Sequence, residues 1–110
     1  MAWNGFAGTG LRVDLSTRAI RKEPLGPELA ERFLGGWGFT HKLAYDLIRP
    51  GIDALSPENV VVVGSGALSG TLAPGSTKAM ATTKLPAGNT IGTPSTGGFS
   101  HQLKSASYDP

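Results

Sequence analysis

The chain has 110 residues, 39% of them hydrophobic, and a formal net charge of +2. This length and composition favour one small folded domain, residues 1–110, over disorder, and so small a charge gives no support to nucleic-acid binding. The absence of cysteine excludes a disulfide framework and any thiolate-bound iron–sulfur cluster or zinc within the chain. No apolar run is long enough to span a membrane and no secretion signal is recognisable, so we expect a cytoplasmic location.

The first predicted element is a β-hairpin over residues 10–25, "GLRVDLSTRAIRKEPL". Leu11, Val13 and Leu15 alternate with polar residues, which is the periodicity of a strand. Residues 16–18 form a polar turn, and residues 19–23 return as a second strand. The basic run over residues 18–22 predicts a solvated edge strand.

Residues 26–51 carry a helical pattern interrupted by glycine. Pro27 suits the first turn of a helix whose apolar face holds Leu29 and Phe33, with Leu34 beside them. The Gly35-Gly36 pair is expected to end or kink this helix. A second helix then follows, because apolar residues recur with helical spacing until Pro50: Phe39, Leu43, Ala44, Leu47 and Ile48.

The second half of the chain predicts strands and one closing helix. Four valines at residues 60–63 favour a strand buried on both faces. Residues 77–85 and 89–96 predict two more strands, and residues 98–108 predict a short helix. The order of strands, helices, strands and helix indicates an α+β fold, since regular βαβ alternation is missing.

The charges divide unevenly along the chain. Seven of the eight carboxylates lie at or before Glu58, and none lies between Asn59 and Tyr108, a stretch that holds Lys78, Lys84 and Lys104. Such a segment could receive an anionic ligand without repulsion, although chance in a loop-rich segment explains the pattern equally well.

Several familiar kinds of site are not supported. The loop over residues 64–71, "GSGALSGT", lacks the Gly-Lys-Ser/Thr ending of a Walker loop and misses the dinucleotide spacing. His41 is expected to be a packing or surface histidine, and His101 a solvated helix residue, although His101 lies close enough to Gly98 to meet an anion. No grouping of histidine and carboxylates has the spacing of metal ligands.

Residues 93–104, "TPSTGGFSHQLK", leave two interpretations open. A helix that begins near Gly98 exposes free backbone N–H groups, which favour an anion. Ser95 and Thr96 could add hydroxyl donors to such a site. Either residue could instead only cap the helix, which is the commoner arrangement.

Taken together, five segments resemble the N-terminal domain of the tungsten-dependent aldehyde:ferredoxin oxidoreductase family: "LRVDLSTRAI", "ELAERFLGGWG", "DALSPENVVVVGSGALSGTLAPGS", "TTKLPAGNTIG" and "STGGFSHQLKSASYD". The resemblance implies an enzyme that oxidises aldehydes to carboxylic acids and passes electrons to ferredoxin. Its cofactors would be tungsten, or molybdenum, held by two pterins and one [4Fe-4S] cluster. The family domain is a base of two similar β/α halves under the pterins, and this chain has the length of the first half.

The resemblance also implies site residues. Lys78 stands where the family usually has an arginine that meets the pterin phosphates, and it keeps the charge but not the bidentate fork. Ser95, Thr96, Gly97 and Gly98 stand where the family has Asn-Ser-Gly-Gly in contact with the pterin. Gly97 matches, and Ser95 offers a hydroxyl in place of an amide, which suggests a divergent branch.

In the family, the cysteine ligands and the acid–base residues come from later domains, so this chain should not be a complete enzyme. We expect it to be completed by further domains or a companion subunit, to deliver electrons to a ferredoxin-type acceptor, and to self-associate when alone, because half of a two-part base leaves apolar surface uncovered. The alternative is a non-catalytic stand-alone module that binds an anion or a partner protein through the same glycine-rich face.

Overall fold

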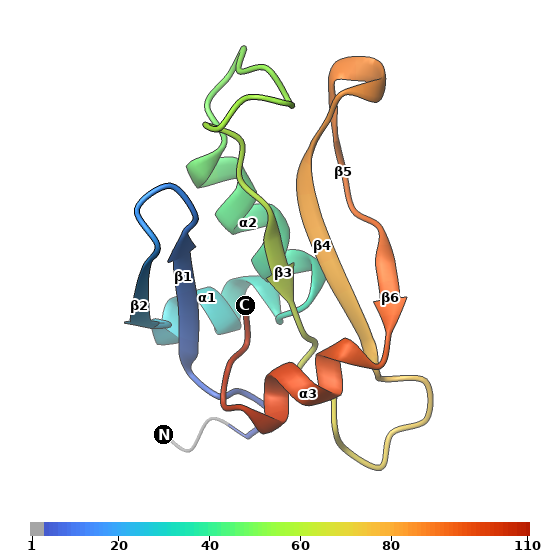
Figure 1. Ribbon diagram of the computed structural model, residues 1–110. Coiled ribbons are helices and arrows are strands. Elements are labelled where there is room, and N and C mark those ends of the chain that lie inside the picture. Colours follow the sequence, from blue (N-terminus) through green and yellow to red (C-terminus); the bar gives the residue numbers. More distant parts are fainter. Residues whose placement is uncertain (1–3) are drawn as a thin grey trace.

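A computed structural model of the protein describes residues 4–110 (Figure 1). The chain opens with strands β1, Thr9–Asp14, and β2, Ala19–Pro24, which pair in antiparallel fashion as a two-stranded sheet. The Asp14 carboxylate accepts hydrogen bonds from the N–H groups of Ser16 and Thr17, at 2.9 and 3.0 Å, and so closes the turn. The predicted hairpin is confirmed, and its second strand is exposed along almost its whole length.

Two helices follow, α1 at Pro27–Phe33 and α2 at Trp37–Leu47. The predicted break between them is confirmed: Leu34, Gly35 and Gly36 all have positive φ, which ends α1 and turns the chain. Leu34, predicted beside the apolar face of α1, is instead the C-cap residue in a left-handed conformation, and its side chain is 78% exposed. None of the helices in residues 4–110 has the length and apolarity that crossing a membrane requires.

The second sheet is built around the longest strand. Strand β4, Lys78–Leu85, pairs on one side with β3, Val62–Gly64, and on the other with β5, Thr90–Gly92, and β6, Ser95–Gly97, all antiparallel. A short 3-10 turn, η1 at Ala87–Asn89, joins β4 to β5. The closing helix α3, Phe99–Ser105, confirms the predicted order of strands, helices, strands and helix and hence the α+β class.

The valine run is not buried on both faces, contrary to the prediction. Val62 is buried, but Val61 is 62% exposed and β3 has only three residues. The reason lies in the neighbours of β3: β4 covers one edge, while on the other edge, within residues 4–110, the backbone hydrogen bonds begin only at Ser65, which meets Asp109 and Gly36. The valine run predicts a strand in the middle of a sheet, whereas β3 is paired with a strand, β4, along one edge.

The core is small and partly polar. Helix α2 packs against β3 and β4 and buries Phe39 and Ala44. Between helix and sheet, the Thr82 hydroxyl donates to Thr40 Oγ1 at 2.7 Å, and both residues are fully buried. Hydroxyls at this contact keep their hydrogen bonds, so their burial costs little.

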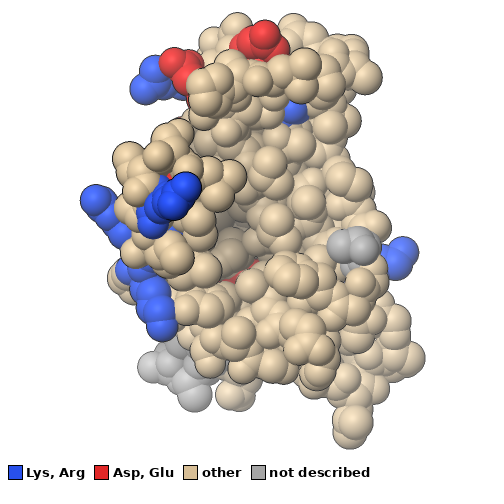
Figure 2. Space-filling model, viewed as in Figure 1, with Lys and Arg blue, Asp and Glu red and all other residues tan. Residues whose placement is uncertain are grey.

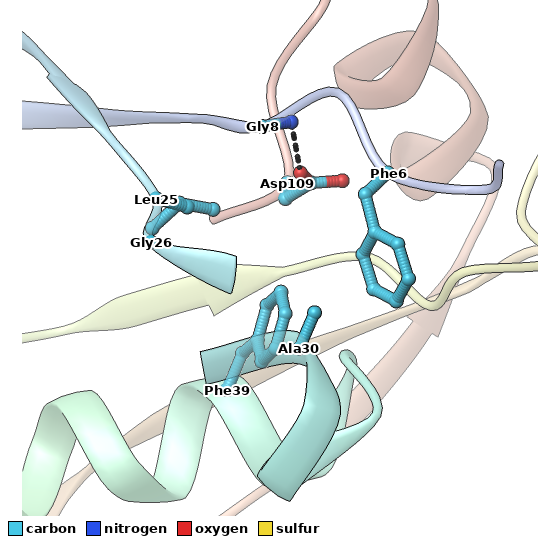
Figure 3. A pocket seen from close by; sticks show the side chains of 7 residues that line it. All are labelled: Phe6, Gly8, Leu25, Gly26, Ala30, Phe39 and Asp109. Atoms are coloured by element: carbon cyan, nitrogen blue, oxygen red, sulfur yellow. Dashed lines mark hydrogen bonds between the residues drawn. The ribbon is translucent and has the colours of Figure 1, made fainter. Parts of the chain in front are cut away.

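Asp109 joins the two ends of the chain, a role that sequence analysis missed. Its buried carboxylate accepts hydrogen bonds from the N–H groups of Ala7 and Gly8, at 3.1 and 2.7 Å, and forms an ion pair with Lys104. Figure 3 shows this carboxylate above a small hollow, with the rings of Phe6 and Phe39 on the other side. The residue before the C-terminal proline is therefore part of the core.

Candidate functional site

The pairing of β4 with β6 brings the predicted site residues together. Lys78 lies opposite Gly97, and Met80 lies opposite Ser95, with Thr96 between them opposite Ala79. The resemblance had placed Lys78 and residues 95–98 at one site, and the sheet makes them neighbours on adjacent strands. Nothing in the sequence pattern indicated this pairing, since residues 77–85 and 89–96 were predicted only as separate strands.

Lys78 differs from the other lysines. Within residues 4–110, its ammonium group has no hydrogen-bond, ion-pair or aromatic partner, whereas each other lysine has one: Lys22 the Tyr108 ring, Lys42 the Asp46 carboxylate, Lys84 the Ile52 carbonyl and Lys104 the Asp109 carboxylate. The side chain of Lys78 is exposed at the start of β4. It is therefore a cation available to a ligand.

Gly97 and Gly98 leave the surface beside Lys78 uncovered. Both are exposed, and a Cβ placed on either would meet no atom within 4 Å. Gly98 has a φ of +83°, a conformation that favours glycine. A ligand could thus approach the backbone here more closely than at residues with side chains.

The capping interpretation of Ser95 and Thr96 is wrong. Helix α3 begins at Phe99, its N-cap is Gly98, and no side chain caps it. Ser95 and Thr96 lie in β6, where the backbone is extended and bonded to β4, so neither residue occupies the N-cap position, which is Gly98. The side chain of Thr96 lies outside the described part of the structure, and the Ser95 side chain is exposed.

Few charges surround this strand pair. In Figure 2, most charged atoms on the visible face lie over the β1–β2 hairpin and at the top of the molecule, while the surface over β4, β6 and α3 is nearly uncharged. The one carboxylate after Glu58, that of Asp109, is buried and paired with Lys104. An anion at the β4–β6 pair would therefore meet Lys78 without a competing carboxylate nearby in sequence.

Neither histidine belongs to this group of residues. His41 is exposed, which is the surface alternative of the prediction; its Nδ1 donates to the Trp37 carbonyl at 2.9 Å, and its Nε2 lies 3.2 Å from the Thr93 hydroxyl. His101 is exposed on α3 and faces Gly70, with 3.6 Å between its Nδ1 and the position of a Cβ there. The loop over residues 64–77, which follows β3, forms turns and bends without a helix.

Lys78, Ser95, Gly97 and Gly98 on the β4–β6 pair are all exposed. A groove of about 450 Å³ does occur elsewhere, between the C-terminal end of α2 and the β4–β5 connection, where Tyr45, Arg49 and Ile91 line it. Lys78 and residues 95–98 line neither that groove nor the small hollow beside Asp109. A ligand held by the strand pair would need further protein to enclose it.

Comparison with known proteins decides the family. Residues 10–110 match the N-terminal domain of aldehyde ferredoxin oxidoreductase. This chain belongs to the aldehyde ferredoxin oxidoreductase family. It is 39% identical over 106 residues to the tungsten-containing aldehyde ferredoxin oxidoreductase of Pyrococcus furiosus, and 38% identical to that of Pyrococcus horikoshii. In both cases the match covers 96% of this chain and 18% of the relative.

One solved structure contains a region that is similar to this chain. The active-site complex BamBC of benzoyl-coenzyme A reductase, in complex with 1,5-dienoyl-CoA, superposes with a TM-score of 0.92 at 32% identity. That match covers 96% of this chain and 16% of the solved chain. The family resemblance and the α+β unit are therefore both confirmed, and the chain spans about a fifth of the length of its relatives.

Proposed function

We propose that this chain is the cofactor-facing part of an aldehyde ferredoxin oxidoreductase-like enzyme. The observation that carries the proposal is the β4–β6 pair, which sets the unpartnered Lys78 opposite Gly97. The relatives are tungsten-containing enzymes by name, and the chain matches their N-terminal domain. The cofactor proposed here is tungsten, or molybdenum, held by two pterins.

The residues present fit a group of this kind. Lys78 offers an exposed ammonium for a pterin phosphate, and the absence of side chains at Gly97 and Gly98 leaves room above the backbone. Ser95, exposed on β6, would add a hydroxyl. We include Thr96 in the contact region because its backbone pairs with Ala79 between these residues.

The cofactor, when bound, would supply the oxidation of an aldehyde to a carboxylate, with the electrons passing to a ferredoxin-type acceptor. The part of this chain would be to bind and orient the cofactor. A [4Fe-4S] cluster would be held by other polypeptide, since this chain has no cysteine. Further domains or a companion subunit would enclose the site.

The experiment is to produce the chain alone and together with the domains or subunit that complete the enzyme. Tungsten and molybdenum are measured by mass spectrometry, and pterin by fluorescence after oxidation. We expect metal and pterin in the completed protein at a constant ratio. A completed protein that contains neither would contradict the proposal and favour a non-catalytic binding module.

A further inference from the structure

The groove beside the C-terminal end of α2 has no part in the proposed cofactor site. It lies between that end of α2 and the β4–β5 connection, in the upper part of Figure 1, and its volume is about 450 Å³. A groove of this size can hold a small organic molecule. Lys78 and residues 95–98 do not line it, so it is separate from the β4–β6 pair.

A buried cation lines this groove. Lys84 is only 9% exposed, and its ammonium group donates to the Ile52 carbonyl. An ammonium group has further N–H donors, and within residues 4–110 these have no partner. Lysine is almost never buried unless it is paired, because an uncompensated charge away from water is costly. An anion in the groove would therefore meet a charge that no carboxylate of the described chain neutralises.

A second cation borders the same space. Arg49 lines the groove and is exposed, and within residues 4–110 its guanidinium has no hydrogen-bond, ion-pair or aromatic partner. The nearest carboxylates in sequence are engaged elsewhere: Asp46 pairs with Lys42 at 2.6 Å, and Asp53 accepts from the Leu55 N–H at 2.9 Å. No aspartate or glutamate of the described chain lines the groove. The groove is therefore positively charged.

The segment that connects the two cations is held in place. The Ile52 N–H donates to the Arg49 carbonyl at 3.4 Å, so a tight turn brings Arg49 close to the carbonyl that holds Lys84. The Asn59 side-chain amide donates to the Ala54 carbonyl at 2.8 Å and to the Lys84 carbonyl at 3.0 Å, which ties the following loop to β4. The two cations thus lie near each other before any ligand arrives.

Apolar side chains line other parts of the groove. Ile48 and Tyr45 contribute from the end of α2, and Ile91 contributes from β5. Ile91 is 43% exposed and Tyr45 is 85% exposed, so apolar surface is open to the solvent here. Covering such surface is favourable. A ligand with an apolar body would therefore gain more from this groove than a bare ion would.

We propose that this groove binds a small organic anion, a carboxylate carried on an aliphatic chain. The carboxylate accepts charge-assisted hydrogen bonds from Lys84 and from the planar fork of Arg49. The aliphatic chain lies against Ile48, Tyr45 and Ile91. The inference does not depend on the proposed cofactor, since the groove lies apart from the β4–β6 pair and binding is measured without pterin or metal.

The test titrates the 110-residue protein with hexanoate and, in parallel, with hexanamide, which has the same chain and no charge. NMR follows the backbone amides of Asn89, Thr90 and Ile91. Hexanoate should shift these signals to saturation. Hexanamide should bind at least about tenfold more weakly, because it cannot form the charge-assisted bonds. The Leu25 amide, which donates to the Gly8 carbonyl beside the hairpin, should not shift.

Substitutions separate the two cations. Arg49→Gln should weaken hexanoate binding about tenfold and, since Arg49 is exposed, should leave the fold intact. Arg21→Gln is the matched control, because it removes an exposed arginine of β2, away from the groove, and it should leave binding unchanged. Lys84→Met keeps an apolar stem without the buried charge and should abolish saturation. Circular dichroism verifies that each variant is folded.

Several results would overturn the proposal. Equal affinity for hexanoate and hexanamide would show that the charges take no part, as would equal hexanoate affinity of Arg49→Gln and Arg21→Gln. Inorganic phosphate that binds as tightly as hexanoate would show that the apolar walls contribute nothing. If the same amides shift with protein concentration alone, and light scattering detects a dimer, the groove belongs instead to an acidic side chain of a second copy.

Discussion

Lys78 is the residue on which the proposed site depends most. Replacing it with alanine should weaken pterin binding by the completed protein at least about tenfold, and so lower its pterin content, because a charge-assisted hydrogen bond to phosphate contributes about 1.5–3 kcal/mol. Arginine at this position should retain pterin, since it keeps the charge. The matched control is Lys22→Ala on β2, which removes an exposed cation far from residues 95–98 in the fold. Equal pterin content in Lys78→Ala and Lys22→Ala would remove Lys78 from the site.

Alanine substitutions at Gly97 and Gly98 test two different roles of glycine. At Gly97 the substitution changes only the space available to a ligand, and at Gly98 it also strains the backbone. Gly97→Ala should change the free energy of unfolding by less than about 0.5 kcal/mol, because its methyl group meets no atom within 4 Å. It should nevertheless lower the pterin content, since the methyl group occupies the surface proposed for the cofactor. Gly98→Ala should also cost about 1–2 kcal/mol, because its φ is +83°. Urea unfolding and pterin analysis of both variants test this, and full pterin retention by Gly97→Ala would contradict it.

Asp14 makes the hairpin turn sensitive to acid. The Thr17 backbone N–H, with help from the Thr17 side chain and the Ser16 N–H, lowers the pKa of Asp14 below its ordinary value of 3.8. A lowered pKa means that the carboxylate stabilises the turn above about pH 4, and that this is lost as the pH falls through the folded-state pKa. The Thr17 amide signal in NMR should shift with Asp14 in a titration below pH 4. In Asp14→Asn the shift should be absent, and a persisting shift would point to another group.

The junction of α1 and α2 depends on a glycine. A Cβ on Gly38 would lie 1.9 Å from the Phe33 carbonyl oxygen at the end of α1, and a backbone atom cannot move aside as a side chain can. Gly38→Ala should therefore lower the free energy of unfolding by about 1–3 kcal/mol, the usual range for forced overpacking. Urea denaturation measures the change, with Gly97→Ala as the control glycine variant. A Gly38→Ala protein as stable as wild type would mean that the helices cross with more space than observed.

The elements themselves could be predicted from local signals, whereas their contacts could not. Alternation in β1, helical spacing in α2 and the Gly35-Gly36 break each act within a few residues, and all three are confirmed. The pairing of β6 with β4 links positions that no local pattern relates, so Ser95 could be interpreted as a cap. The role of Asp109 was missed for the same reason, since its partners Ala7 and Gly8 lie at the other end of the chain.

The family resemblance predicted more of the candidate site than the local chemistry of residues 95–98 did. From the residues alone, a helix cap was the better interpretation of residues 95–98. The resemblance grouped them with Lys78, and the strand register then placed Lys78 opposite Gly97. Neither source indicated how exposed the site is: Lys78, Ser95, Gly97 and Gly98 all lie at the surface.

The molecule as a whole exposes more surface than its mass predicts. Its accessible surface is 7288 Å², roughly a quarter more than the about 5800 Å² expected of a folded monomer of 11.4 kDa. The excess is larger than the about 800 Å² that each partner contributes to an interface of standard size. Part of it is apolar and lies on the hairpin, where Leu11, Val13 and Ile20 are all at least 37% exposed. Covering that apolar face would stabilise the domain.

The isolated chain should consequently self-associate. Val13 and Ile20 are opposite each other across β1 and β2, so their side chains lie on one face of the hairpin. Replacing both with threonine keeps strand propensity but removes apolar surface, and should raise the dissociation constant about tenfold or more, since each side chain buries an apolar group worth more than 1 kcal/mol. Leu72→Thr, fully exposed in the loop over residues 64–77, is the control and should leave association unchanged. Light scattering across a range of concentrations measures the effect, and a wild-type chain that stays monomeric at the highest concentration would contradict it.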